Sequence, residues 1–220
     1  MLNKLKICVT AATLLPVAVW AQTIKQDEAK YPSSSITPIF SQVLITFIPK
    51  GFEIAFANAS ATDYIHELIP KGENVSQWTQ MLTVTGAKDI ALNPQLTPQQ
   101  VAGFFGAGFQ STCPNSFNAH VFPNHHQING HDSVSIIVSC GTSKATQGTT
   151  SEIALITVIK GKKDYYTIQW AERGSPSATP IQIDLPKWSS RLEQQIKPIK
   201  LCTAIAGEKA PYPSCLNSIK

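Results

Sequence analysis

The sequence predicts an α+β fold: an antiparallel β-sheet meander with two or three helices packed on one face, stapled by disulfides. Three observations predict it. Residues 152–170 combine a long β-branched run, a charged turn that holds Gly161 and an aromatic-rich run, which is a strong β-hairpin signal. Two segments with helical spacing begin after Thr97 and Asp184. Four cysteines follow the apolar start of the chain, an even number typical of an exported, disulfide-bonded protein.

The first 21 residues have the features of a secretory signal peptide. Two lysines precede an apolar run that reaches Trp20, and a small-residue cleavage site ends at Ala21. This run is shorter than the roughly 20 apolar residues of a membrane span. No later stretch is apolar enough to span a membrane. We therefore expect a periplasmic or secreted protein with no transmembrane segment after cleavage.

The rest of the chain is long enough for one domain with a substantial core. We expect a flexible N-terminal arm over residues 22–37, which are polar, and a single α+β domain over residues 38–220. The formal net charge of +4 is small and the charges are scattered. Because nucleic-acid-binding proteins carry a basic patch or stripe, we expect no nucleic acid among the partners.

The first half of the domain is predicted to be a meander. The strand candidates, rich in β-branched and aromatic residues, are 43–48, 52–56 and 63–70. Asn74 and Gln77 have the form of a capping box. We therefore expect a short helix from there to Met81, followed by a strand at 82–85.

A longer helix is predicted to begin at Thr97. Threonine is a common N-cap, Pro98 suits the first turn, and Gln100 completes a capping box. The apolar residues that recur at helical spacing are Val101, Phe104, Phe105 and Phe109. Since the glycines among them cost helix stability, we expect this helix to pack closely against the sheet.

The cysteines are predicted to form two bridges. Two strands that flank a loop at 123–130 are expected to pair, which brings Cys113 and Cys140 to the same end of the ribbon. We therefore favour the bridges Cys113–Cys140 and Cys202–Cys215, and the other pairings stay open. A zinc site is disfavoured, because no pair has Cys-x2-Cys spacing.

The outer ends of the central hairpin carry the candidate ligand-binding residues Glu152, Glu172, Arg173 and Trp170. Two carboxylates beside an arginine can hold a ligand or do acid–base chemistry. The structural alternative is a salt bridge at the rim of the sheet, worth less than about 1 kcal/mol. The chain has no Gly-x-Ser-x-Gly motif. No catalytic residue is assigned, and a hydrolase that uses Glu152, Glu172 or histidine is kept as an alternative.

Four histidines fall within twelve positions across one predicted hairpin: His120, His125, His126 and His131. Converging imidazoles can bind zinc, copper or nickel, so metal binding is a second alternative. Solvated histidines in a polar loop are the structural alternative, because the spacing matches no standard site. Apart from such a transition metal, the sequence implies no cofactor.

The chain resembles small exported bacterial proteins of unassigned function in four runs: Pro49-Lys-Gly-Phe52, residues 64–73, Trp78-Thr-Gln-Met81, and Cys140-Gly with Glu152, Gly161 and Tyr166. Its opening strands, meander and covering helices are similar to the Mog1/PsbP-like fold. The resemblance implies a binding or assembly accessory rather than an enzyme. The cysteine pairs and the phenylalanine-rich helix depart from that pattern.

Export, disulfides and the lack of a catalytic motif therefore favour a non-catalytic accessory protein. We expect it to bind a partner protein or a small ligand in the cell envelope.

Overall fold

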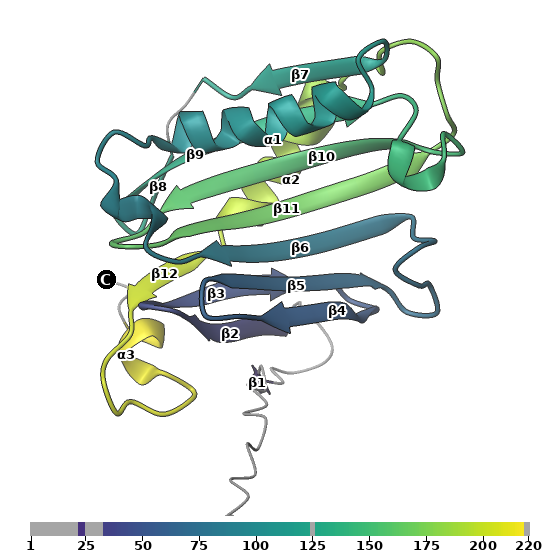
Figure 1. Ribbon diagram of the computed structural model, residues 1–220. Helices are drawn as coiled ribbons and strands as arrows, with labels where there is room; N and C mark the ends of the chain where they lie inside the picture. Colours follow the sequence, from purple (N-terminus) through teal and green to yellow (C-terminus); the bar gives the residue numbers. More distant parts are fainter. Residues whose placement is uncertain (1–21, 25–32, 124–125, 218–220) are drawn as a thin grey trace, which may run out of the picture.

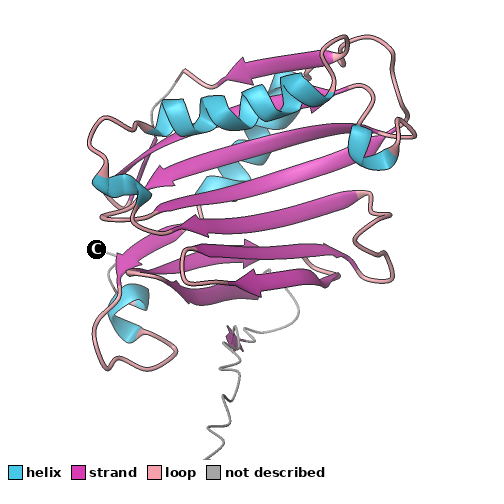
Figure 2. Cartoon of the chain, viewed as in Figure 1, coloured by secondary structure: helices cyan, strands magenta, loops and turns pink. Residues whose placement is uncertain are grey.

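The computed structural model describes residues 22–24, 33–123 and 126–217 (Figure 1). The predicted signal peptide lies outside these residues. The described chain forms two antiparallel sheets and three α-helices, which Figure 2 colours by type. The predicted class, a disulfide-stapled α+β fold built on antiparallel sheet, is confirmed. No helix within the described ranges is long and apolar enough to cross a membrane.

The larger sheet has the central hairpin near its middle. Its strands, in spatial order, are β4 (Phe52–Ala59), β5 (Asp63–Pro70), β6 (Gln80–Ala87), β11 (Tyr165–Gly174), β10 (Ser151–Lys160), β9 (His131–Cys140) and β7 (Phe117–Val121), with β8 (His126–Ile128) beside the start of β9. β10 and β11 pair along their whole length, from Ser151 opposite Gly174 to Lys160 opposite Tyr165. The predicted hairpin is therefore confirmed. Of the predicted meander, the strands at 52–56 and 63–70 pair as β4 and β5, but the strand at 43–48 lies in the smaller sheet, so the three-strand meander is corrected.

The smaller sheet contains part of the predicted arm. Its order is β1 (Gln22–Ile24), β2 (Ser33–Ile39), β3 (Gln42–Ile48) and β12 (Lys200–Thr203). Residues 22–24 and 33–37 of the predicted arm thus lie in strands, and residues 25–32 are outside the described chain. The hydroxyls of Ser35 and Thr37 bond each other at 3.0 Å, and Ile36 between them is buried. Paired hydroxyls make this polar run compatible with a buried strand.

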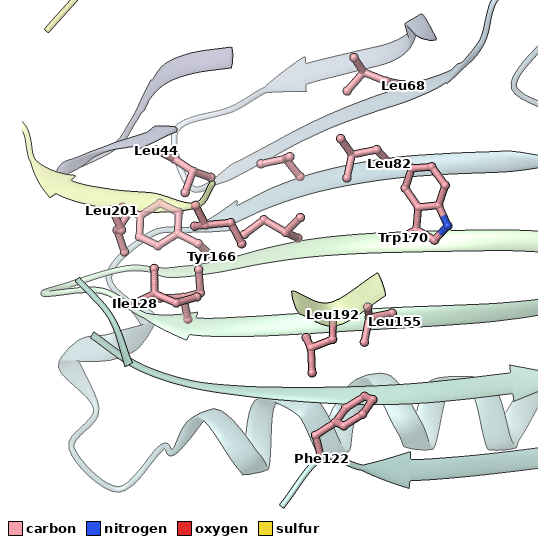
Figure 3. Close-up of a cluster of buried hydrophobic side chains, with 14 of the residues drawn as sticks. Leu44, Leu68, Leu82, Phe122, Ile128, Leu155, Tyr166, Trp170, Leu192 and Leu201 are labelled. Carbon is pink, nitrogen blue, oxygen red and sulfur yellow. The ribbon is translucent and has the colours of Figure 1, made fainter. Parts of the chain in front are cut away.

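Helices cover both faces of the larger sheet, which corrects the expectation of one covered face. α1 (Pro98–Thr112) packs on the side of Ile156, whereas α2 (Leu185–Ile196) packs on the side of Leu155 and Trp170 (Figure 3). The reason lies in β10. Neighbouring residues of a strand point to opposite faces, and residues 153–159 are apolar on both faces except for one threonine, so both faces need a cover.

The smaller sheet packs on the same side as α2. Leu44 of β3 and Leu201 of β12 share one core cluster with Leu82 and Tyr166 (Figure 3). The carboxylate of Asp164, the residue before β11, is buried beside this junction. It accepts hydrogen bonds from the backbone N of Ser41 at 3.1 Å and from the hydroxyl of Tyr166 at 3.1 Å. The two sheets are therefore joined by polar as well as apolar contacts. The tail ends with α3 (Pro213–Leu216).

The helix expected from Asn74 to Met81 is wrong. Oδ1 of Asn74 accepts from the backbone N of Ser76 at 3.1 Å and of Gln77 at 3.0 Å, which makes a turn. Met81 lies on β6, opposite Ala171. An asparagine that accepts from nearby backbone N–H groups can start a helix or form a turn, and here the pairing of β6 decides. Two short 3₁₀-helices, η1 (Ile90–Leu92) and η2 (Lys144–Thr146), complete the fold.

Candidate functional site

The helix α1 is capped at its start and is joined to the sheet by a disulfide at its end. The predicted capping box is present at its start: Oγ1 of Thr97 accepts from the N of Gln100 at 3.3 Å, and Oε1 of Gln100 accepts from the N of Thr97 at 2.8 Å. At its end, the disulfide Cys113–Cys140 joins it to β9, with 5.7 Å between the Cα atoms. Its buried residues are Pro98 and Ala102, and Ala102 belongs to the core on this side of the sheet.

A groove of about 520 Å³ lies between the second half of α1 and the ends of β9 and β10. Three phenyl rings line it, those of Phe104, Phe105 and Phe109. Phe104 is 67% exposed, although it is a large apolar residue. The only charged residue among the described groove-lining residues is Glu152. The groove therefore combines an aromatic wall with one carboxylate.

Glu152 is paired with an arginine across the hairpin. It lies opposite Arg173 in the β10–β11 register, and Nε of Arg173 donates to its Oε2 at 3.2 Å. The side chains of Arg173 and Glu152 are only 10% and 18% exposed. Burial raises the pKa of Glu152, and the charge and hydrogen bond of Arg173 offset part of this effect. Within the described chain, no group donates a hydrogen bond to the other oxygen, Oε1.

Arg173 is itself held in place from the other side. Its guanidinium carbon lies 3.7 Å from the centre of the Trp78 indole, and its Nη1 donates to the carbonyl O of Ser76 at 3.4 Å. With Trp78 and Thr150 it lines a polar cleft of about 640 Å³. The ion pair therefore separates an apolar groove from a polar cleft.

Glu67 is a residue that the sequence reasoning missed. It lies on β5, in a cross-strand row with Thr83, Gln169 and Ile156, which places it on the α1 side of the sheet. Burial raises the pKa of Glu67, and the charge of Glu152 raises it further. The sequence signal that could have found Glu67 is its spacing from Ile69. The two residues are two positions apart on one strand, so they point to the same face, and Ile69 is buried there.

The structure does not bring Glu152 and Glu172 together. Glu172 lies opposite Ile153, one position from Arg173, so its side chain points to the α2 side. It accepts from Nε1 of Trp170 at 3.0 Å and from Nζ of Lys187 at 2.7 Å. The expectation that the two carboxylates lie together is therefore corrected, and the hydrolase alternative stays a prediction.

The surroundings of Glu172 fasten α2 to the sheet. Burial acts to raise the pKa of Glu172, but hydrogen bonds from Lys187 and Trp170 and the charges of Lys187 and Arg191 outweigh it, so the pKa is lowered. Trp170 is buried, and the guanidinium carbon of Arg191 lies 4.3 Å from its ring centre. Trp170 is thus a packing residue and presents no open ring to a ligand.

The four histidines are only partly described. His125 and the side chain of His126 lie outside the described residues. Nδ1 of His131 donates to the carbonyl O of Lys160 at 3.2 Å, which leaves Nε2 to accept from the amide of Gln42 at 3.2 Å. His120 packs edge-on against Phe122. Within the described chain, no three histidine, cysteine or acidic side chains form a metal site, and the metal hypothesis stays a prediction.

The second predicted bridge, Cys202–Cys215, is also present, with 5.5 Å between the Cα atoms. Structural disulfides form and persist in oxidising compartments. Two of them indicate an extracytoplasmic location.

No protein-family model matches the chain, and no curated protein matches it. Solved structures share its fold remotely. The Ran-binding protein Mog1p of Saccharomyces cerevisiae has 10% identity and a TM-score of 0.42, over 76% of this chain and 95% of that chain. The cyanobacterial PsbP (CyanoP) of Synechocystis has 10% identity and a TM-score of 0.45, over 80% and 97%. A protein of Bacteroides thetaiotaomicron has 12% identity and a TM-score of 0.39, over 76% and 47%. The remote similarity to the Mog1/PsbP-like fold that the sequence indicated is thus found, and it concerns the chain path alone.

Proposed function

We propose that the protein is a non-catalytic binding protein, periplasmic or secreted, that holds a small amphipathic ligand in the groove beside α1. The observation that carries the proposal is a single, largely buried carboxylate in a phenylalanine-lined groove. Small-molecule sites typically have volumes of roughly 300–1,000 Å³ and mostly apolar linings with a few placed polar groups. The groove, at about 520 Å³, has this size and composition.

The charges favour a ligand whose polar end donates hydrogen bonds. Oε1 of Glu152 is an acceptor without a donor in the described chain. Glu152 and Glu67 act on each other electrostatically, and Arg173 pairs with Glu152. Glu152 is the charged residue that lines the groove, and Glu67 adds a second negative charge on the same side of the sheet. An amine is therefore favoured over a carboxylate.

The apolar part of the ligand is expected to lie along α1. Phe105 and Phe109 are partly buried and Phe104 is open to solvent, so a hydrocarbon chain would cover rings that now face water. The groove also lacks the parts of a serine hydrolase. No histidine is among its described lining residues, and a serine nucleophile needs a base in contact. Binding is therefore favoured over hydrolysis.

The test is isothermal titration of the disulfide-intact protein with decylamine, decanol and decanoate at neutral pH. We expect decylamine to bind most tightly and decanoate most weakly. Glu152→Gln should remove the preference for the amine, and Phe105→Ala should weaken all three ligands. Glu193→Gln, an exposed residue on the other side of the sheet, is the matched control and should change nothing.

Two outcomes would contradict the proposal. If none of the three compounds binds, the groove is not a site for such ligands, and the alternative of a partner protein gains support. If Glu152→Gln keeps the amine preference, the carboxylate does not select the ligand.

A further inference from the structure

The polar cleft on the other side of the Glu152–Arg173 ion pair has the size of a ligand site, at about 640 Å³. It lies between residues 73–79, which precede β6, and residues 146–150, which precede β10. Both segments are at the end of the larger sheet where β6 and β10 begin (Figure 1). Apart from Trp78, every described residue that lines the cleft has a hydroxyl, an amide or a charge on its side chain. The cleft therefore suits a polar ligand, unlike the groove beside α1.

Four of the hydroxyl groups that line the cleft offer acceptors to a ligand, because each donates its hydrogen within the protein. The donors and their acceptors are Ser76 to Oδ1 of Asn74 at 2.6 Å, Thr79 to Oε1 of Glu73 at 2.7 Å, Thr149 to the carbonyl O of Thr146 at 2.7 Å and Thr150 to Oγ1 of Thr146 at 2.8 Å. A hydroxyl has one hydrogen and two lone pairs. Each of these four groups therefore has lone pairs left for the hydrogens of a ligand.

Arg173 supplies donors to the same cleft. Its side chain is only 10% exposed, and it is held between Glu152 and the ring of Trp78. Of the five N–H groups of a guanidinium, one donates to Glu152 and one to the carbonyl O of Ser76, so the others have no acceptor in the described chain. The glutamines that line the cleft, whose side-chain amides are also unpaired among the described residues, are Gln77 and Gln147.

The charges in the cleft do not select a charged ligand. Arg173 and Glu73 are the charged residues among those described as lining it. Arg173 is paired with Glu152. The two carboxylate oxygens of Glu73 accept from the backbone N and from the hydroxyl of Thr79, both at 2.7 Å. Since both charges already have partners, a neutral ligand is favoured over an ion.

We propose that the polar cleft is a binding site for a neutral saccharide. Each sugar hydroxyl both donates and accepts, so it can use the lone pairs and the N–H groups that the cleft offers together. A bound peptide also needs pockets for its side chains. The one aromatic ring among the described lining residues, that of Trp78, is 7% exposed and lies under the guanidinium of Arg173. The saccharide is therefore favoured over a peptide.

The test is titration of the disulfide-intact, ¹⁵N-labelled protein with maltotriose, cellotriose and triacetylchitotriose, followed by NMR. We expect at least one of these neutral trisaccharides to bind and to shift the backbone amides of residues 73–79, 146–150 and 173. Chitotriose, the cationic parent of triacetylchitotriose, the anionic trigalacturonate and the peptide trialanine are the comparison ligands. Each of them should bind more weakly than the best neutral sugar.

Two substitutions of exposed residues locate the site. Gln77→Ala removes an unpaired amide, and Thr149→Val removes a hydroxyl but keeps the shape of the side chain. Each should weaken saccharide binding by about fivefold, the value of one lost hydrogen bond. The matched control is Gln110→Ala, an exposed glutamine of α1 that does not line the cleft. Phe104→Ala, in the groove beside α1, should also leave saccharide binding unchanged.

Three results would overturn the proposal: no binding of any of the neutral trisaccharides, equal or tighter binding of a comparison ligand, or unchanged affinity in both the Gln77→Ala and the Thr149→Val variants. Circular dichroism checks that the variants are folded. If they are not, the amide shifts of the parent protein decide, and shifts confined to other residues contradict the site. Decylamine binding in the groove does not depend on these outcomes, so the two proposals fail separately.

Discussion

Glu152 and Arg173 face each other across the central hairpin on the side covered by α1, and Nε of Arg173 lies 3.2 Å from Oε2 of Glu152. Glu172, the residue before Arg173, is on the side of α2 and is paired there with Lys187. Glu172 and Arg173 are neighbours on β11, so their two ion pairs lie on opposite faces of the sheet. The groove contains an acid held in an ion pair through one of its oxygens, which suits a binding site more than acid–base catalysis.

Arg173→Ala is expected to lower the free energy of unfolding by about 2–3 kcal/mol, because it leaves Glu152 largely buried without its cation. It also removes the guanidinium that stacks on Trp78. Adding Glu152→Gln should recover part of the loss. Urea denaturation measures both. Lys197→Ala, which breaks an exposed pair with Glu193, is the control and should change stability by less than about 0.5 kcal/mol. An Arg173→Ala variant as stable as the parent would contradict this account.

Asp164 should make the fold sensitive to acid. Burial acts to raise its pKa, but hydrogen bonds from Ser41, Asp89 and Tyr166 outweigh it, so the pKa is lowered. A lowered folded-state pKa stabilises the fold above the unfolded value of about 3.9, and this stabilisation is lost as the pH falls through the folded value. Asp164→Asn should therefore cost about 2 kcal/mol at neutral pH, and the difference from the parent should shrink in acid. Unfolding curves across that range test it, and a difference that does not vary with pH would argue against it.

The two disulfides should have different effects on binding. Replacing Cys113 and Cys140 by alanine opens a link between residues 27 positions apart, and the same change at Cys202 and Cys215 opens one between residues 13 apart. Loop-closure entropy predicts losses of about 3.5 and about 3 kcal/mol. Only the first bridge ties α1 to β9 beside the groove. Decylamine affinity, measured on folded protein, should fall for the first pair alone, and equal affinities would show that the bridge does not shape the groove.

Two glycine substitutions should have opposite effects. A Cβ on Gly103, in the middle of α1, meets nothing within 4 Å, so Gly103→Ala should stabilise the protein by about 0.5–1 kcal/mol. A Cβ on Gly161 would overlap the side chain of Gln42 and lie 2.7 Å from Cε2 of Tyr166. Gly161→Ala should therefore destabilise the protein by about 1–3 kcal/mol. Thermal unfolding of the two variants side by side is the measurement, and melting shifts of the same sign would contradict the packing described.

The predictions that succeeded depend on local signals. The capping box at Thr97, the side-chain cap of Asp184 on the N of Lys187 and the central hairpin each involve residues within one turn or one pair of strands. The capping box expected at Asn74 failed, because the same local hydrogen bonds also make a turn. Which of the two forms depends on where β6 begins to pair with β11, and this is not local information.

The candidate site shows the same division. Glu152 and Arg173 could be placed as neighbours because a hairpin brings the ends of its strands together. Glu67 could not, because two strands, β6 and β11, separate it from β10 in the sheet. The groove itself needs the position of α1, which depends on packing between elements distant in the sequence.

The sequence by itself determined the α+β class, the antiparallel central hairpin and the starts of both long helices, since each follows from residue types at short spacing, and it favoured one of the three cysteine pairings. Only the tertiary structure decided that α1 and α2 lie on opposite faces, that Glu172 is separated from Glu152, and that the polar residues 33–37 form a buried strand. The physical reason is that a strand with apolar residues on both faces must be covered on each face, but its own residues do not determine which element covers which face. That choice is made by the summed burial and hydrogen bonding of the whole chain.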